Sequence, residues 1–428
     1  MRKNIIFLFS FLLLVGCSKS EQNEIIPGDD PNQQPGIVKE ELSVSKSIYL
    51  EIEEKNILEK VKDFGFTILQ DGVPADARNP IVSPLSCSYG LAMLANGMNE
   101  ESVKELLNAV AGEDATLDDW NRVNHTLTTE FLALDPTSVV KISNSVWGNT
   151  GIAFETAFSG EMEKWYSATC NNVDMTSAAA AEAINSWINS ATEGLIPSLF
   201  DNAPGEAAYL INALYFSGKW TMPFDKSLTE KKDFHNADGS VADVDFMNGV
   251  FEDILFAETA DYKAMCLPLG NLGFNFYAIL PREGKNLPLS LAEWYEVRNK
   301  MGSYDEVTVS LPKFKTEFEE VNVKEVLKAK GVKKLFDDAN SLERLCSPMI
   351  DPKTLTFLHK SVLGIDESGA EGASEFMTGM DLAVIGGSGE PSGPKIGEIK
   401  LNRPFLYLIE ERSTHALLFI GVINDLQK

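Results

Sequence analysis

The chain has 428 residues, 44% of them hydrophobic and 9% aromatic, so it can bury a large core in one large domain or two ordinary ones. General disorder is therefore excluded. The 63 acidic residues outnumber the 37 basic ones and give a net charge of -26, which repels a polyanion over most of the surface and argues against nucleic acid as a partner.

The chain begins with the features of an export signal, MRKNIIFLFSFLLLVGCSKS. Arg2 and Lys3 precede an apolar run of about ten residues, which is too short to span a bilayer stably. The run ends in 14-LVGC-17, which resembles the bacterial lipoprotein box, whose cysteine is diacylated and becomes the new N-terminus. The resemblance implies removal of residues 1–16, a lipid on Cys17 and an outer-membrane lipoprotein that faces the periplasm or the cell surface. The alternative is an ordinary signal with an incidental cysteine.

Residues 17–46 are rich in Gln, Asn, Pro, Gly and acids and predict a flexible tether, followed by one folded domain over residues 47–428. Apart from Cys17, the cysteines are widely separated and form no CxxC pair, so we expect no metal site. We expect buried free thiols, although an exported protein can also oxidise its cysteines to disulfides. These residues are Cys87, Cys170, Cys266 and Cys346.

The N-terminal third is predicted to be mostly helical. Apolar residues recur at helical spacing from Ile48 to Leu69, and a second helix is expected from Ser86, after the breaker Ser83-Pro84, to beyond Met98.

The middle and end of the chain show the alternation of strands, separated by Gly, Pro and Asn turns. Strands are predicted at 208–216, 263–268, 274–280 and 307–311. Residues 404–424 predict a buried hairpin of two strongly apolar strands around a polar turn, Glu410–Thr414. No repeat or internal linker divides the domain, so the pattern favours a single α+β domain.

Enzyme signatures are missing from the sequence. Its four histidines form no HExxH motif, and it contains neither a GxSxG elbow nor a GxxxxGK[ST] loop. The run 386-GGSG-389 precedes Glu390-Pro391 rather than an apolar helix, so it reads as a loop and not as a phosphate site. A pair of carboxylates suited to acid-base chemistry, as in a glycosidase, stays open as an alternative. We expect no cofactor.

Residues 370–382 carry a pattern of alternation that matters for function. In an extended strand the even positions share one face, and here they are uncharged: Ala370, Gly372, Ser374, Phe376, Thr378, Met380 and Leu382. The odd positions include Glu371, Glu375 and Asp381. One face suits a core and the other suits water. A half-buried edge strand would show the same pattern.

The surrounding motifs resemble the serpin superfamily from about residue 48 to the C-terminus. In chain order they are 79-NPIVSPLS-86, 212-NALYFSGKW-220 with Pro223-Phe224, 311-LPKF-314, 359-HKSV-362 leading to Glu367, Arg403-Pro404-Phe405 and 419-FIG-421.

The resemblance implies a serpin fold, with three β-sheets, eight to nine helices and an exposed reactive loop at residues 368–402. It also implies a monomeric suicide inhibitor of serine proteases, with cysteine proteases as a second possible target class and no turnover chemistry. In this family a protease cuts the loop, and the freed arm then inserts into the large sheet as a new central strand. The alternative is a non-inhibitory binding protein of the same fold.

Three groups of site residues follow from the resemblance. The shutter, a polar cluster beneath the strands that part, is Ser83, Ser86, Asn212 and His359. The breach, where the loop first enters, is Lys313, Glu367 and Trp220. The hinge of the loop is Gly369, Ala370, Glu371, Gly372, Ala373 and Ser374, where the glycines supply backbone freedom. Ala370 stands where inhibitors usually carry Thr or Ser, and Glu375 replaces a small residue, but Glu375 is expected to point to water.

The family cuts at the seventeenth residue counted from the position of Glu367, which predicts the bond Ala383-Val384 as the reactive bond. Its neighbours are small or aliphatic, which favours elastase-like or subtilisin-like proteases over trypsin-like ones. The segment after the bond, GGSGEPSGPKIGE, is longer than is common in the family, so the bond could lie anywhere from Met380 to Ile385.

Overall fold

The computed structural model describes residues 45–355, 357, 359–369 and 394–427, all within one unit of contacts, Ser43–Lys428. Helices dominate its first third, as predicted, and strands dominate the rest. The helices in this part of the chain are α1 (Ile52–Asp71), α2 (Pro84–Ala95), α3 (Glu100–Val110), α4 (Leu117–Phe131), α5 (Thr156–Tyr166), α6 (Ala178–Ala191), α7 (Leu291–Arg298), α8 (Val323–Ala329) and α9 (Lys334–Asp337).

The first two helices differ from their predicted bounds. The segment before Ile52 is not helical, although the Ile48 side chain is buried in the core. Helix α2 begins at Pro84, because the Ser83 side chain accepts the N–H of Ser86 as an N-cap and proline suits the first helical position. It ends at Ala95, before Met98. Ser83-Pro84 therefore starts the helix and does not interrupt it.

The strands form sheets of seven, four and three strands and two sheets of two. The seven-stranded sheet has the order β1 (Ile81–Val82), β18 (Leu417–Ile423), β17 (Phe405–Glu411), β10 (Phe274–Pro281), β9 (Tyr262–Leu269), β8 (Ile254–Glu258) and β11 (Gly302–Tyr304). The four-stranded sheet has the order β16 (Ile396–Lys400), β12 (Glu306–Pro312), β7 (Val241–Phe251) and β6 (Glu230–His235). The end of the predicted reactive loop is thus strand β16, which pairs in parallel with β12.

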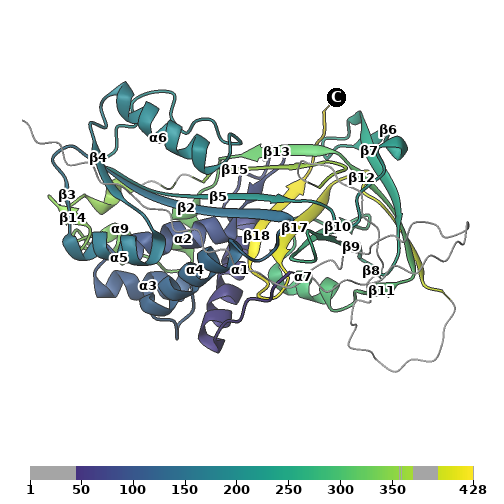
Figure 1. Ribbon diagram of the computed structural model, residues 1–428, viewed down its shortest axis with the longest axis horizontal. Coiled ribbons are helices and arrows are strands. Elements are labelled where there is room, and N and C mark those ends of the chain that lie inside the picture. Colours follow the sequence, from purple (N-terminus) through teal and green to yellow (C-terminus); the bar gives the residue numbers. More distant parts are fainter. Residues whose placement is uncertain (1–44, 356, 358, 370–393, 428) are drawn as a thin grey trace, which may run out of the picture. The chain divides into compact units, whose positions relative to one another are not determined.

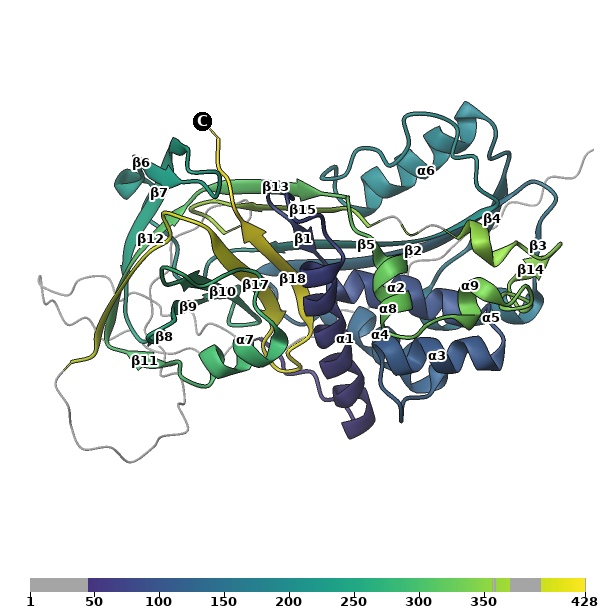
Figure 2. The ribbon, with the colours of Figure 1, turned by 180° about the vertical axis from the view of Figure 1, so that it is seen from behind.

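The three-stranded sheet has the order β4 (Cys170–Val173), β2 (Ser138–Asn149) and β5 (Ala208–Gly218), and β13 (Phe314–Phe318) pairs with β15 (Ser361–Ile365). The last pair is β14 (Cys346–Ser347) with β3 (Ala153–Phe154). Helix α6 lies over one face of β2 and β5, and α2 and α4 lie on the other face (Figure 1), as the view from behind confirms (Figure 2). The fold is α+β, as predicted.

Strand β5 faces two apolar environments with alternate side chains. Phe216 belongs to the main core, and Leu210 and Leu214 pack against it. Ala213 faces the opposite way and packs with Ile188 of α6 in a separate apolar cluster. Even-numbered residues of β5 therefore face the main core, and odd-numbered residues face α6.

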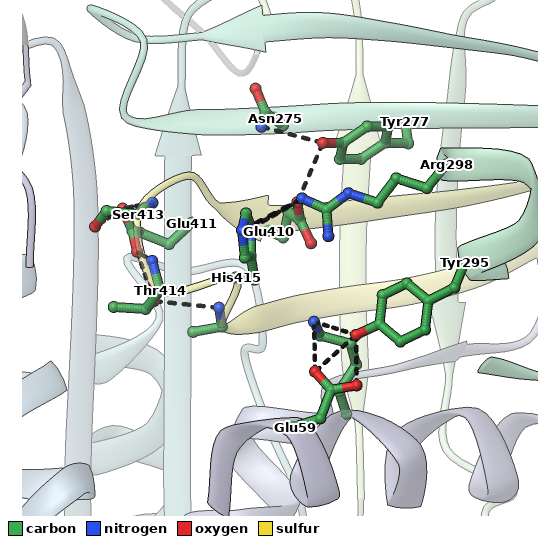
Figure 3. Close-up of polar contacts among 12 residues, drawn as sticks. Glu59, Asn275, Tyr277, Tyr295, Arg298, Glu410, Glu411, Ser413, Thr414 and His415 are labelled. Atoms are coloured by element: carbon green, nitrogen blue, oxygen red, sulfur yellow. Dashed lines mark hydrogen bonds and ion pairs between the residues drawn. The ribbon is translucent and has the colours of Figure 1, made fainter. Parts of the chain in front are cut away.

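The C-terminal hairpin is present and buried, but its turn is shorter than predicted. Glu410 and Glu411 belong to β17 and are each 1% exposed. Glu410 pairs with Arg298 of α7 at 3.1 Å, and Glu411 accepts hydrogen bonds from the backbone and hydroxyl groups of Ser413 and Thr414 (Figure 3). Both acids were predicted to lie in the turn, and both are buried with partners: Glu410 is paired through one carboxylate oxygen, and Glu411 through both.

The four cysteines of the described domain are free thiols. Cys87, Cys266 and Cys346 are buried and Cys170 is half-buried, so the prediction of buried thiols holds for three of them. In the same part of the chain, none of the helices combines the length and apolar character needed to cross a bilayer.

Candidate functional site

A cavity of about 450 Å³ separates β5 from β15. Residues 208–217 line one side of it, residues 359–366 line the other, and Leu91 and Leu94 of α2 lie at its base. Among the described strands, β5 pairs only with β2, β15 pairs only with β13, and no ladder joins the two. Two strand edges therefore face each other across a gap, and such edges are templates for another strand.

At one end of the gap, Gly369 is already paired on both sides. It forms antiparallel bridges with Lys219, which follows β5, and with Asp366, which follows β15. Its N–H donates to the carbonyl oxygen of Asp366, and its own carbonyl accepts the N–H of Asp366, each at 3.2 Å. Gly369 thus occupies the place of the first residue of a strand between β5 and β15.

Only glycine fits this position. Gly369 has a φ of 97°, a conformation that costs L residues free energy. A Cβ atom would contact the carbonyl oxygen of Gly218 and would lie 2.6 Å from the backbone nitrogen of Trp220, so the backbone itself would have to move.

The predicted breach residues meet beside Gly369. The ammonium of Lys313 lies 3.0 Å from a carboxylate oxygen of Glu367, and Thr229 donates its hydroxyl to the same carboxylate at 2.8 Å. Burial alone would raise the pKa of Glu367, but hydrogen bonds from Lys313, from the backbone and from Thr229 outweigh it and hold the pKa below its usual value. Because Lys313 is 37% exposed, solvent screens part of this attraction.

Trp220 holds the same turn from the side of β5. Its indole N–H donates to the carbonyl oxygen of Asp366 at 2.7 Å, and its backbone N–H donates to that of Ser368 at 3.2 Å. The ring packs edge-on against Phe224 and Phe276, which fixes its position. The turn that precedes the loop is therefore held from both sides of the gap.

The predicted shutter residues also meet, near the base of the gap. The Ser83 N–H donates to Nε2 of His359 at 3.0 Å, and the Ser86 hydroxyl donates to the Oδ1 of Asn212 at 2.6 Å. His359 is 7% exposed, and burial lowers its pKa to about 4. Since a backbone N–H can only donate, Nε2 is the acceptor, and the proton of the neutral ring lies on Nδ1.

The structure adds partners that the motifs did not indicate. Asn144 of β2 accepts the side-chain N–H of Asn212 at 2.8 Å and donates to the carbonyl oxygen of Tyr166 at 3.1 Å. Ser361 lies 3.1 Å from Nε2 of His359. The signal for Asn144 was register: it stands directly opposite Asn212 in the antiparallel pair of β2 and β5.

Cys87 and His359 bring a thiol and an imidazole together, 3.6 Å apart. Catalytic cysteines need a lowered pKa and access to substrate. Burial instead raises the pKa of Cys87 to about 12, and its side chain is only 8% exposed. The thiol therefore stays protonated, and this pair is a packed part of the shutter rather than an activated nucleophile.

Several predicted residues lie outside the described ones. They are Cys17, the hinge residues Ala370, Glu371, Gly372, Ala373 and Ser374, and the reactive bond Ala383-Val384. Of the hinge, the structure describes Gly369.

Comparison with known proteins agrees with this arrangement. Residues 59–426 match the family described as Serpin (serine protease inhibitor). A serine protease inhibitor of Cyanea capillata is 28% identical over 82% of this chain and 94% of its own. The native state of the thermophilic serpin tengpin superposes with a TM-score of 0.74 at 25% identity, covering 89% of this chain and 96% of that one.

Human thyroxine-binding globulin, solved in a complex with thyroxine, has the same fold, with a TM-score of 0.74 at 19% identity over 88% of this chain and 100% of its own. A gap between two strand edges, a glycine that already pairs across it and the family match over most of the domain agree with one another. The chain belongs to the serpin family.

Proposed function

We propose that this protein is a single-use inhibitor of serine proteases, in which the cut reactive loop enters the gap between β5 and β15 as a new strand. The observation that carries the proposal is the two-sided pairing of Gly369 at the end of an open gap. The first residue of the new strand is in place, so insertion is the extension of a ladder that has already begun. Extension avoids the cost of nucleating a strand.

The bridge between Lys219 and Gly369 defines the register of the inserted strand. Continued antiparallel, it pairs residues 370–380 with residues 218–208, which is the whole length of β5. Directly opposite residues of such a pair lie on the same face. Even-numbered loop residues would therefore join the even-numbered residues of β5 on the core side.

The chemistry of the core-facing residues agrees with this register. Gly372 would lie opposite Phe216, Ser374 opposite Leu214, and Phe376 opposite Asn212 of the shutter. None of the even-numbered loop residues is charged, so insertion would bury no unpaired charge in the main core. At about 1 kcal/mol net for each added hydrogen bond, the driving force is on the order of 10 kcal/mol.

The other face sets a condition that the sequence did not reveal. Glu375 would lie opposite Ala213, which is 4% exposed beneath α6. The expectation that Glu375 points to water therefore requires the end of α6 near Ile188 to move away as the strand arrives. Burial of the carboxylate would otherwise oppose insertion at this residue.

The proposed targets are elastase-like or subtilisin-like proteases, cut at Ala383-Val384. The test is to mix the purified protein with an elastase and look for a complex that survives denaturing electrophoresis. The released C-terminal peptide should begin at Val384 by mass, and trypsin should nick the loop without forming a complex. Efficient cleavage by every protease with no stable complex would contradict the proposal.

A non-inhibitory binding role is the second candidate, favoured by the thyroxine-binding globulin, whose fold is shared at low identity. The two roles differ in what loop cleavage does. An inhibitor gains a central strand on cleavage, so its unfolding temperature should rise sharply. Equal thermal transitions before and after cleavage would favour the binding role.

We further propose that Cys17 carries a lipid that anchors the protein in the outer membrane. More than one acyl chain satisfies the requirement for stable anchoring. The variant Cys17→Ala should lose the acyl mass and leave the membrane fraction. Membrane association without acyl mass in the wild type would contradict the anchor.

A further inference from the structure

We propose that Asp135 is a positioning residue for loop insertion. It holds the turn between β9 and β10, this turn contacts Lys219, and Lys219 pairs with Gly369 and so sets the register of the inserted strand. The inference rests on the proposed function and adds a residue that no motif indicated. Asp135 lies in the loop between α4 and β2 and is 6% exposed, although it is a carboxylate. A buried acid needs hydrogen-bonding partners, and those partners show what it holds together.

Asp135 joins two segments that are far apart in sequence. One carboxylate oxygen accepts the N–H and the hydroxyl of Thr137, each at 2.8 Å. The other oxygen accepts the N–H of Asn271, at 2.7 Å, in the turn between β9 and β10. The carboxylate therefore ties the beginning of β2 to a turn of the seven-stranded sheet.

The turn is shaped to receive this carboxylate. Gly270 has a φ of 65°, and a Cβ atom there would collide with a carboxylate oxygen of Asp135. A Cβ atom at Gly273 would lie 2.8 Å from the same oxygen. Two residues without side chains thus leave the space that the carboxylate fills.

The same turn reaches the end of β5. The Gly270 N–H donates to the carbonyl oxygen of Lys219 at 2.7 Å, and Thr221 donates its hydroxyl to the carbonyl oxygen of Gly270 at 2.6 Å. Lys219 is the residue that bridges to Gly369. One hydrogen-bonded path therefore runs from Asp135 through the turn to the first residue of the future strand.

This path matters because β2 and β5 form one unit. They pair without interruption from Ser138–Gly218 to Gly148–Ala208. A strand that enters beside β5 has to pair with this unit, whose position at the Gly369 end is set by Asp135 and Lys219. If β2 and β5 were loosely held at this end, the register of the bridge between Lys219 and Gly369 would be lost. The bond between the protease and the loop would then be hydrolysed, and the protease released, before the strand forms.

The test compares Asp135→Asn with the wild type. Both carboxylate oxygens of Asp135 accept hydrogen bonds, whereas the NH2 group of an asparagine can only donate them. The variant would therefore lose the hydrogen bonds to Thr137 or the one to Asn271. We expect the stoichiometry of inhibition of an elastase to rise about fivefold. This change is smaller than the one that would follow if the full free energy of a hydrogen bond to a charged group were lost. Thr137→Val removes a single hydroxyl from the carboxylate and should raise it less, by about twofold.

The matched control is Glu54→Gln. Glu54 is 4% exposed, accepts the N–H of Glu51 and pairs with Arg122, so it is a buried acid of α1 that has no link to the turn. We expect Glu54→Gln to lower the urea midpoint of unfolding about as much as Asp135→Asn does. The stoichiometry of inhibition should stay at the wild-type value. A purely structural role for Asp135 would make the two variants alike, and that result would overturn the inference.

Hydrogen exchange in the uncut protein gives a readout that does not depend on inhibition. The amides of Trp220 and Gly369 should exchange several-fold faster in Asp135→Asn and at the wild-type rate in Glu54→Gln. If the wild type traps no protease, the proposed inhibitory function fails while the exchange result still decides the role of Asp135. Wild-type exchange at both amides in Asp135→Asn would overturn the positioning role.

Discussion

Acidification should destabilise the protein through His359, and the size of the effect follows from its burial. The pKa of the ring falls from 6.5 to about 4 because the charged form would be desolvated. The unfolded chain then binds a proton that the folded protein does not, so the free energy of unfolding decreases as the pH falls below 6.5 and stops decreasing near pH 4. Above pH 6.5 this residue should not contribute to the pH dependence of the free energy of unfolding.

At about 1.4 kcal/mol for each pH unit, the loss from His359 should reach about 2 kcal/mol at pH 5 and about 3 kcal/mol below pH 4. A second effect points the same way. Protonation places a hydrogen on Nε2, which then faces the N–H of Ser83 and no longer accepts it. Both effects act at the base of the gap.

The assay is urea unfolding of the intact wild type and of His359→Gln between pH 7.5 and pH 5. Glutamine does not titrate in this range, and the two proteins share every other ionisable group. The free energy of unfolding should therefore fall by about 2 kcal/mol more in the wild type than in the variant. Parallel pH profiles would refute the assignment of a buried neutral histidine at this position.

Gly369→Ala should prevent the pairing with Lys219 and Asp366 and turn the protein into a substrate that elastase cleaves without forming a complex. The control Gly239→Ala changes a glycine that also has a positive φ, 84°, but lies in open space, so it should retain inhibition. A stable complex with Gly369→Ala would contradict this account. Asn212→Ala should cost about 1 kcal/mol in urea unfolding, because it leaves the half-buried Ser86 hydroxyl without its acceptor, and an unchanged midpoint would argue against the shutter cluster. Glu375→Ala should lower the stoichiometry of inhibition, since no carboxylate then has to pass beneath α6; an unchanged or higher value would show that the register argument is wrong at this residue.

The sequence was sufficient for the fold class and the main strands. Strands 208–216 and 274–280 were predicted within one or two residues of their ends, because alternation of apolar residues is a local property. The shutter and breach residues were found only through their resemblance to family motifs. Nothing in the sequence shows that Ser83 and His359, separated by 276 residues, would share a hydrogen bond.

Buried polar groups were the weak point of sequence reading. Glu410 and Glu411 were predicted to lie in a polar turn, and no motif singled out Asp135, yet all three are buried. Glu410 and Asp135 each depend on a partner from a distant segment, Arg298 and Asn271, so their burial could not be predicted from neighbouring residues. Glu411 differs, because its donors are its neighbours Ser413 and Thr414.

By itself, the sequence determined which segments are apolar enough to form strands and that the even positions of 370–382 carry no charge, because both depend on residue type and local period. Only the tertiary structure decided that β5 and β15 stand apart across a cavity, that Gly369 pairs on both sides of it, and that α6 covers the face that Glu375 would occupy. These features depend on contacts between residues such as Lys219 and Gly369, which chain folding alone brings together, and no local pattern encodes them.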